Sequence, residues 1–259
     1  MQRVKSPTGA TVSYETYGTG PALVLVHGAF SDHRTNWEFV RPLFEKQFTV
    51  YAIARRGRGE TDATQGHSLE DESKDVVAVV GAIGQPVFLL GHSYGAHCGL
   101  IAASLAPEHI RKLVLYEAAW PHLLSAAALT RLEGLAAAGA WDDFTLTFFR
   151  DTLAVPVAEL EAVRTTALWA PMLADAPASL GDLRALRRYD FRAERLRSLR
   201  IPVLLQIGSE SPRELYVTDA LAAVLPHASV ETLPGQAHEG MTTAPALYAR
   251  AVTRFLLSA

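Results

Sequence analysis

A serine near the middle of the chain stands in a context that favours nucleophilic catalysis. The apolar run Pro86–Leu90 is followed by Gly91-His92-Ser93-Tyr94-Gly95, and an alanine-rich stretch of helical composition continues to Pro107. Gly-x-Ser-x-Gly between a strand and a helix predicts a nucleophile elbow, a strained turn from which the serine hydroxyl projects. Ser93 is therefore the candidate nucleophile for acyl transfer. The alternative interpretation is a glycine-rich turn that contains a serine by chance.

A second turn could stabilise the negative charge that such chemistry develops. The unbroken apolar run Ala22–Val26 is typical of a strand buried on both faces of a parallel sheet, and it ends at His27-Gly28-Ala29-Phe30. The amide of Ala29 could pair with that of Tyr94, at the start of the helix after the elbow, as an oxyanion hole. Phe30 is then a candidate substrate contact. A plain loop is the alternative interpretation.

Two glutamates follow predicted strands and could act as an acid partner. Lys112–Tyr116 is a buried strand that delivers Glu117 to its carboxyl end, and Pro202–Ile207 is a strand followed by Gly208, Ser209 and Glu210. Functional side chains in parallel sheets gather at the carboxyl ends of the strands. Both glutamates are therefore expected at the same edge of the sheet as Ser93.

The remaining elements complete an alternation of strands and helices. Patterning predicts an edge hairpin at Thr11–Tyr17, a helix at Asn36–Lys46, a strand at Thr49–Ile53, a helix from Ser68 to Gly84, a strand at Ser229–Leu233 and a helix at Pro245–Leu257. The arginine- and glycine-rich turn from Arg55 to Thr61 lacks the spacing of a nucleotide-binding loop. We interpret it as structural, with arginines that bond to loop carbonyls.

Between about Trp120 and Arg200 the strand–helix alternation stops, and helical segments rich in alanine, leucine and aromatic residues replace it. This pattern predicts a helical cap at residues 120–200, inserted after the sixth strand of a core formed by residues 1–119 and 201–259. Most aromatic residues of a cap belong to its core, but its underside must form a pocket. Trp120, Trp141 and Trp169 are the candidates for that pocket.

Composition limits the remaining classes of function. The chain has 259 residues, 49% of them apolar, and a net charge of −3 with interspersed signs, so neither a nucleic-acid nor a membrane partner is favoured. Cys98, the only cysteine, excludes an intrachain disulfide and a cysteine metal cluster. No apolar signal segment or membrane span is apparent, so a soluble cytoplasmic protein is expected. The sequence leaves the oligomeric state unknown.

These motifs together resemble the α/β-hydrolase superfamily across nearly the whole chain. The resemblance rests on His27-Gly28, on Gly91 to Gly95, and on Gly235-x-x-His238 in a loop after the last strand. It implies a mostly parallel central sheet with helices on both faces. It also implies that Ser93 attacks an acyl carbon, that His238 takes and returns the proton, and that an acid orients the imidazole.

The family resemblance leaves two positions for the acid. Many members place an aspartate after the strand equivalent to Pro202–Ile207, three residues past a glycine, where this chain has Ser211 beside Glu210. Haloalkane dehalogenases and zearalenone-type lactone hydrolases use a glutamate directly after the preceding strand, which matches Glu117. The lactone hydrolases are also similar around Gly208 to Pro212. Glu117 is favoured, and Glu210 is the alternative.

The sequence thus predicts a serine hydrolase of carboxylic esters or lactones that forms an acyl-enzyme without a metal or organic cofactor. A small-molecule ester or lactone is the expected partner. Carbon–carbon bond hydrolysis and perhydrolysis use the same triad and remain alternatives. A non-catalytic small-molecule receptor of this fold is the alternative from a different class, since fold does not fix function.

Overall fold

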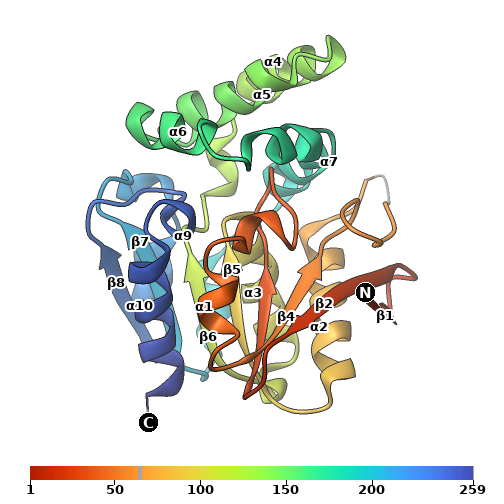
Figure 1. Cartoon of the computed structure of the whole chain (residues 1–259), viewed down its shortest axis with the longest axis vertical. Coiled ribbons are helices and arrows are strands. Elements are labelled where there is room, and N and C mark those ends of the chain that lie inside the picture. The colour runs from red at the N-terminus through yellow and green to blue at the C-terminus, as the bar shows by residue number, and fades with distance from the viewer. Residues whose placement is uncertain (64–65, 259) are drawn as a thin grey trace.

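One sheet forms the centre of the molecule in the computed structural model, which describes residues 1–63 and 66–258 (Figure 1). Its eight strands lie in the order β1-β2-β4-β3-β5-β6-β7-β8. The strands are β1 Gln2–Lys5, β2 Thr11–Tyr17, β3 Ala22–Val26, β4 Thr49–Ala54, β5 Val87–His92, β6 Ile110–Tyr116, β7 Val203–Gly208 and β8 Ala228–Leu233.

The direction of each strand follows its sequence pattern. β1 and β2 pair antiparallel at one edge, β2 pairs antiparallel with β4, and all further neighbours are parallel. Every residue of β3, β5 and β7 is buried, as expected for apolar strands that are covered on both faces. The predicted mostly parallel sheet is confirmed, and the carboxyl ends of β3, β5, β6 and β7 meet at one edge.

Helices cover both faces of the sheet. One face packs against α2 Leu69–Ile83, α3 Tyr94–Leu105 and α8 Thr218–Val224, and the other against α1 Arg41–Phe44 and α10 Pro245–Leu257. The short α9 Gly240–Thr243 precedes α10. The predicted helix from Ser68 to Gly84 is confirmed, since α2 begins with a capping box between Ser68 and Asp71 and ends at Gly84 in the left-handed region.

The prediction of one helix over Asn36–Lys46 is wrong. The structure has a 3-10 turn at Thr35–Trp37 and then the short α1. Pro42 lies in the first turn of α1, and a proline without an N–H is tolerated at a helix start but not in a helix interior. The apolar side chains Trp37 and Phe44 are buried against the sheet nonetheless, so the apolar periodicity is real although the helix is broken.

The helices between β6 and β7 form a layer over the carboxyl edge of the sheet (Figure 1). They are α4 Ala126–Ala137, α5 Trp141–Thr147, a π-helical turn Phe148–Thr152, α6 Val157–Arg164 and α7 Trp169–Arg188. Phe144, Phe148 and Phe149 bury their rings around Phe30 of the core. The predicted cap after the sixth strand is thus confirmed. None of the helices described is long and apolar enough to cross a membrane.

Candidate active site

Ser93 occupies the strained turn that its motif predicts. It lies between β5 and α3 with φ 53° and ψ −118°, a conformation that costs free energy for a residue with a side chain. A Cβ atom at Gly91 would lie 2.5 Å from the carbonyl oxygen of Gly95, and one at Gly95 would collide with the carbonyl oxygens of Val26 and His27 at the end of β3. Glycine is therefore required on both sides of the serine, whose side chain remains partly exposed.

Glu117 and His238 lie in direct contact although 121 positions separate them in sequence. Glu117 follows β6, His238 follows β8, and His238 Nδ1 lies 2.9 Å from Glu117 Oε2. The other oxygen of Glu117 accepts hydrogen bonds from the Gly208 amide at 2.8 Å and the Ser211 hydroxyl at 2.6 Å. Both residues of the pair are buried. The carboxylate is therefore held by three donors and aimed at the imidazole.

Burial alone would lower the pKa of His238, but the hydrogen bond and negative charge of Glu117 outweigh it and raise the pKa above 6.5. Among the neighbouring residues, Tyr216 stacks on the imidazole with a ring separation of 6.0 Å. The site therefore stabilises the charged form of the histidine, which a general base adopts during reaction.

Glu210, the alternative acid, lies elsewhere. Its side chain is exposed and accepts a hydrogen bond from the neighbouring Ser209 hydroxyl at 2.9 Å. Ser211, which stands where many family members have an aspartate, instead donates to Glu117. The structure thus brings Glu117, and not Glu210, to the histidine.

Ser93 and His238 are linked through His92, which sequence reasoning did not single out. The His92 and His238 rings are 4.8 Å apart, and His92 Nε2 lies 3.1 Å from the His238 carbonyl oxygen. Within residues 1–63 and 66–258, no hydrogen bond joins the Ser93 hydroxyl to the imidazole. A serine hydroxyl reorients by rotation about χ1, and such contacts commonly tighten only when substrate binds.

In the loop after β3, the Ala29 amide lies between two amides that are hydrogen-bonded within the protein. The Gly28 amide donates to Asn36 Oδ1 at 2.8 Å, and the Phe30 amide donates to Ser179 Oγ of α7 at 2.7 Å. Between them, the Ala29 amide has no acceptor in the part of the chain that the structure describes. The same holds for the amide of Tyr94, the first residue of α3. These are the two amides from which the sequence predicts an oxyanion hole.

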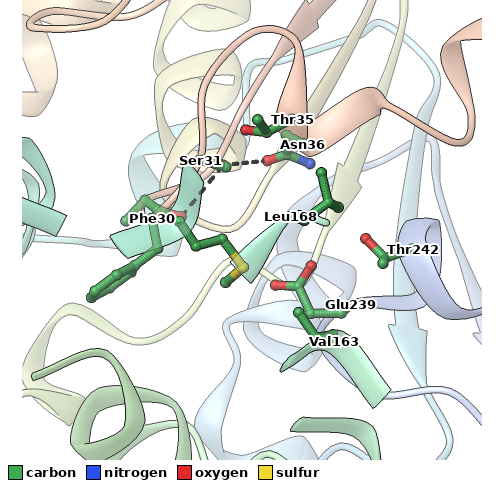
Figure 2. Close-up of a pocket in the computed structure, with 10 residues that line it drawn as sticks. Phe30, Ser31, Thr35, Asn36, Val163, Leu168, Glu239 and Thr242 are labelled. Carbon is green, nitrogen blue, oxygen red and sulfur yellow. Dashed lines mark hydrogen bonds between the residues drawn. The ribbon is translucent and has the colours of Figure 1, made fainter. Parts of the chain in front are cut away.

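A small cavity of about 10 Å³, room for about one water molecule and not for a substrate, lies beside Ala29 between the loop after β3 and the cap (Figure 2). Phe30, Val163, Leu168 and Met172 supply most of its apolar wall. Glu239, the residue after His238, directs its carboxylate into this space near Leu168 and Thr242. Burial raises the pKa of Glu239 to about 7. The pocket therefore combines an apolar wall with one titratable group close to the histidine.

Of the predicted substrate contacts, Phe30 lines this pocket. The three predicted tryptophans are not among the residues that line it. Trp120 packs edge-on against Phe191 at 5.3 Å between ring centres. Trp141 packs against Phe144 inside the cap, and Trp169 Nε1 donates to Asp142 Oδ1 at 2.9 Å. The cap residues that line the pocket are instead Val163, Leu168 and Met172, and nothing in their sequence pattern distinguished them from core positions.

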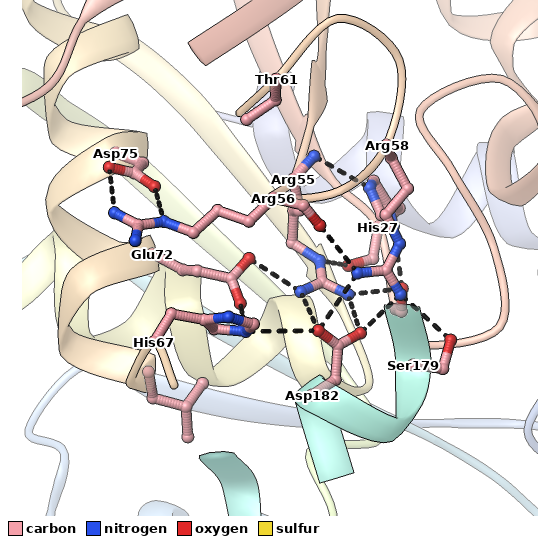
Figure 3. Close-up of polar contacts among 12 residues, drawn as sticks. His27, Arg55, Arg56, Arg58, Thr61, His67, Glu72, Asp75, Ser179 and Asp182 are labelled. Atoms are coloured by element: carbon pink, nitrogen blue, oxygen red, sulfur yellow. Dashed lines mark hydrogen bonds and ion pairs between the residues drawn. The ribbon is translucent and has the colours of Figure 1, made fainter. Parts of the chain in front are cut away.

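A buried charge network joins the cap to the turn after β4 (Figure 3). Arg55 donates to the carbonyl oxygens of His27 and Gly28, as the sequence predicts for this turn, and also to Glu72 of α2. Arg55 and Arg58 both bond to Asp182 of α7, at 2.7 and 2.6 Å. Burial alone would raise the pKa of Asp182, but the two guanidinium groups hold it well below 3.8.

Among the residues that the structure describes, two groups of side chains have metal-ligand spacing, with donor atoms within 4.8 Å of one another. The first is His92, His238 and Glu239, of which His238 is already bonded to Glu117. The second is His67, Glu72 and Asp182, whose carboxylates are neutralised by arginines. Both groups therefore have an explanation within the protein's own contacts.

Comparison with known proteins finds similarity to hydrolases by sequence and by structure. Residues 23–251 match the family model described as alpha/beta hydrolase family. The pyrrolizixenacetamide deacetylase of Xenorhabdus hominickii is 36% identical over 111 residues, which span only 41% of this chain and 41% of that protein. The 2-(acetamidomethylene)succinate hydrolase of Mesorhizobium japonicum is 26% identical over 270 residues, covering 95% of this chain and 91% of that protein. A solved alpha/beta hydrolase from Sphaerobacter thermophilus superposes with a TM-score of 0.82 at 30% identity, covering 98% of this chain and 100% of that one.

Proposed function

The chain belongs to the alpha/beta hydrolase family, and on that premise we propose that it is a serine hydrolase that cleaves carboxylic esters or lactones through an acyl-enzyme. In this proposal residues 1–119 and 201–259 form the catalytic core and residues 120–200 the cap subdomain. The observation that supports it most is the buried contact of 2.9 Å between Glu117 and His238, next to a serine in a strained elbow.

Each residue has a defined step in the proposed mechanism. Ser93 Oγ attacks the acyl carbon while His238 Nε2 takes the hydroxyl proton, and the amides of Ala29 and Tyr94 donate to the oxyanion. Glu117 holds the imidazole by Nδ1 and stabilises the imidazolium. His238 then returns the proton to the leaving alcohol, which leaves the acyl group on Ser93. A water molecule, deprotonated by His238, releases the acid and restores the serine.

Amides of the acetamide type are a second candidate substrate class. The names of two relatives, pyrrolizixenacetamide deacetylase and 2-(acetamidomethylene)succinate hydrolase, both refer to an acetamido group. The same triad serves both bonds, because the proton returned by the histidine can leave on an amine as well as on an alcohol. The similarity to zearalenone-type lactone hydrolases around Gly208 to Pro212 stays a prediction.

The test compares turnover of 4-nitrophenyl acetate, δ-valerolactone and 4-nitroacetanilide by the native protein and by Ser93→Ala. We expect the native protein to hydrolyse at least one ester or lactone and Ser93→Ala to reduce that rate by a factor on the order of 10⁴ or more. Ser104→Ala, which changes a serine near the other end of α3, is the control and should keep full activity.

Turnover that survives in Ser93→Ala would contradict the proposal. Hydrolysis of the anilide alone would assign the chain to amides. A folded native protein that binds these compounds without turnover would favour the receptor alternative, and turnover only with a carbon–carbon or peroxide substrate would favour those chemistries.

A further inference from the structure

A carboxylate of the cap contacts the backbone on both sides of His238. Glu159 lies in the first turn of α6, which packs against α9 just beyond the histidine loop (Figure 1). Its Oε2 accepts a hydrogen bond from the Ala237 amide at 2.8 Å, and its Oε1 accepts one from the Glu239 amide at 2.7 Å. One side chain therefore binds the residues before and after the histidine.

The histidine loop is held from opposite sides by different parts of the molecule. On the core side, the Tyr116 hydroxyl donates to the Ala237 carbonyl oxygen, and His92 contacts the carbonyl oxygen of His238. On the cap side, Glu159 accepts from the amides. The core thus holds carbonyl groups of the loop, and the cap holds its N–H groups.

The contacts of Glu159 fix the position of the histidine loop and do not serve to neutralise a charge. Across the described residues, Glu159 forms no ion pair with a lysine or arginine. Burial raises its pKa, and the two amide hydrogen bonds offset part of that rise. A partly buried carboxylate costs free energy unless it is hydrogen-bonded, and bonds from neutral donors to an ionised acceptor are the stronger ones. The two loop amides therefore account for its placement.

On the basis of the hydrolase function proposed above, we propose that Glu159 is a positioning residue that fixes the His238 loop. It thereby makes the position of the histidine depend on how the cap packs against the core. Glu159 does not touch the reacting atoms. It determines where His238 lies relative to Ser93 by fixing the amides on either side of it. A cap helix displaced from α9 would withdraw both acceptors together.

Glu159 also contributes charge near the histidine. The titratable groups that face His238 are Glu117, Glu159, Glu239, His92 and Tyr216. The negative charge of Glu159 is one of those that raise the pKa of His238. A general base acts in its neutral form, so activity falls as pH drops through that pKa. Removing the Glu159 charge should move this loss of activity to lower pH.

The test is Glu159→Gln, with Glu161→Gln as the matched control. Glu161 lies on the same helix but is exposed and pairs with Arg164. Glutamine keeps the shape of Glu159 but presents an NH₂ group to one of the amides. We expect kcat, counted per phosphonate-titratable Ser93, to fall about 10- to 100-fold with KM for 4-nitrophenyl acetate little changed. The acidic limb of the pH profile should shift to lower pH. Glu161→Gln should leave both unchanged.

A Glu159→Gln protein with native kcat and a native pH limb would overturn the proposal. A smaller number of phosphonate-titratable Ser93 sites, with normal kcat at the sites that remain, would also overturn the proposal. Such a result would mean that Glu159 affects only the stability of the protein. If Glu159→Gln does not fold, Glu159→Asp retains both acceptor oxygens on a shorter stem. In the Glu159→Asp protein, the backbone amides of Ala237 and Glu239 should exchange hydrogen faster than in the native protein. Unchanged exchange together with full activity would overturn the proposal. Absence of any hydrolysis by the native protein would instead contradict the proposed function.

Discussion

At the scale of single residues, the proposed chemistry depends on which carboxylate faces His238. Glu117 accepts three hydrogen bonds and is buried, whereas the exposed Glu210 carboxylate accepts a hydrogen bond from its neighbour Ser209. A buried carboxylate can fix one imidazole tautomer and stabilise the imidazolium in a medium of low dielectric constant. An exposed carboxylate at the surface offers neither effect.

Glu117→Gln should therefore reduce kcat by a factor on the order of 10⁴ with little change in KM, because the amide keeps the shape but not the charge. Glu210→Gln, the control, should change kcat by less than about tenfold. Stopped-time assays with one chromogenic ester measure both. A reversed result, with Glu210→Gln inactive and Glu117→Gln active, would assign the acid to the loop after β7.

The sequence could favour Glu117 because it comes directly after a strand, at the position where the lactone hydrolases that the chain resembles have a glutamate. It could not show that Ser211 donates to Glu117, since that contact joins two loops separated by more than 90 positions. His92 was missed for a related reason. Its role as a bridge between the elbow and the histidine loop depends on the fold and not on its immediate neighbours.

At the scale of elements, the core was largely predictable and the cap contacts were not. The runs Ala22–Val26 and Val87–Leu90 specify buried parallel strands because both faces need apolar side chains. The broken helix around Pro42 shows the limit of periodicity, which reports the buried side but not helical continuity. Asp182, the carboxylate that Arg55 and Arg58 share, lies on a cap helix about 125 positions away, so no local pattern could identify it.

The contact between α7 and the turn after β4 makes Asp182 a strong determinant of stability. Asp182→Ala would leave Arg55 and Arg58 buried without their shared carboxylate, and breaking a buried ion pair in this way costs about 3–5 kcal/mol. Chemical denaturation should show this loss of unfolding free energy.

Asp190→Ala is the matched control, since Asp190 also pairs with two arginines, Arg192 and Arg195, but at an exposed position. Solvent screens exposed pairs, so the denaturation midpoint of Asp190→Ala should move little. Equal effects of the two substitutions would mean that the buried network does not hold the cap.

At the scale of the whole molecule, the cap contacts both loops that complete the elbow. Ser179 of α7 accepts from the Phe30 amide in the loop after β3, and Glu159 of α6 accepts from the amides around His238. The cap therefore has a role besides forming the pocket wall, because it holds the backbone groups on which the proposed catalysis depends. Its composition predicts helices and a pocket, but the positions that line the pocket follow from packing alone.

The central claim is that Ser93 is a nucleophile activated by His238 within this fold. The most direct measurement is mass spectrometry of the native protein after treatment with a 4-nitrophenyl alkylphosphonate, which releases 4-nitrophenolate as the serine oxygen bonds to phosphorus. We predict one adduct per chain, located on Ser93 by peptide mapping, absent in Ser93→Ala and formed far more slowly in Glu117→Gln. A folded native protein that gains no adduct, or gains it at another residue, would contradict the account.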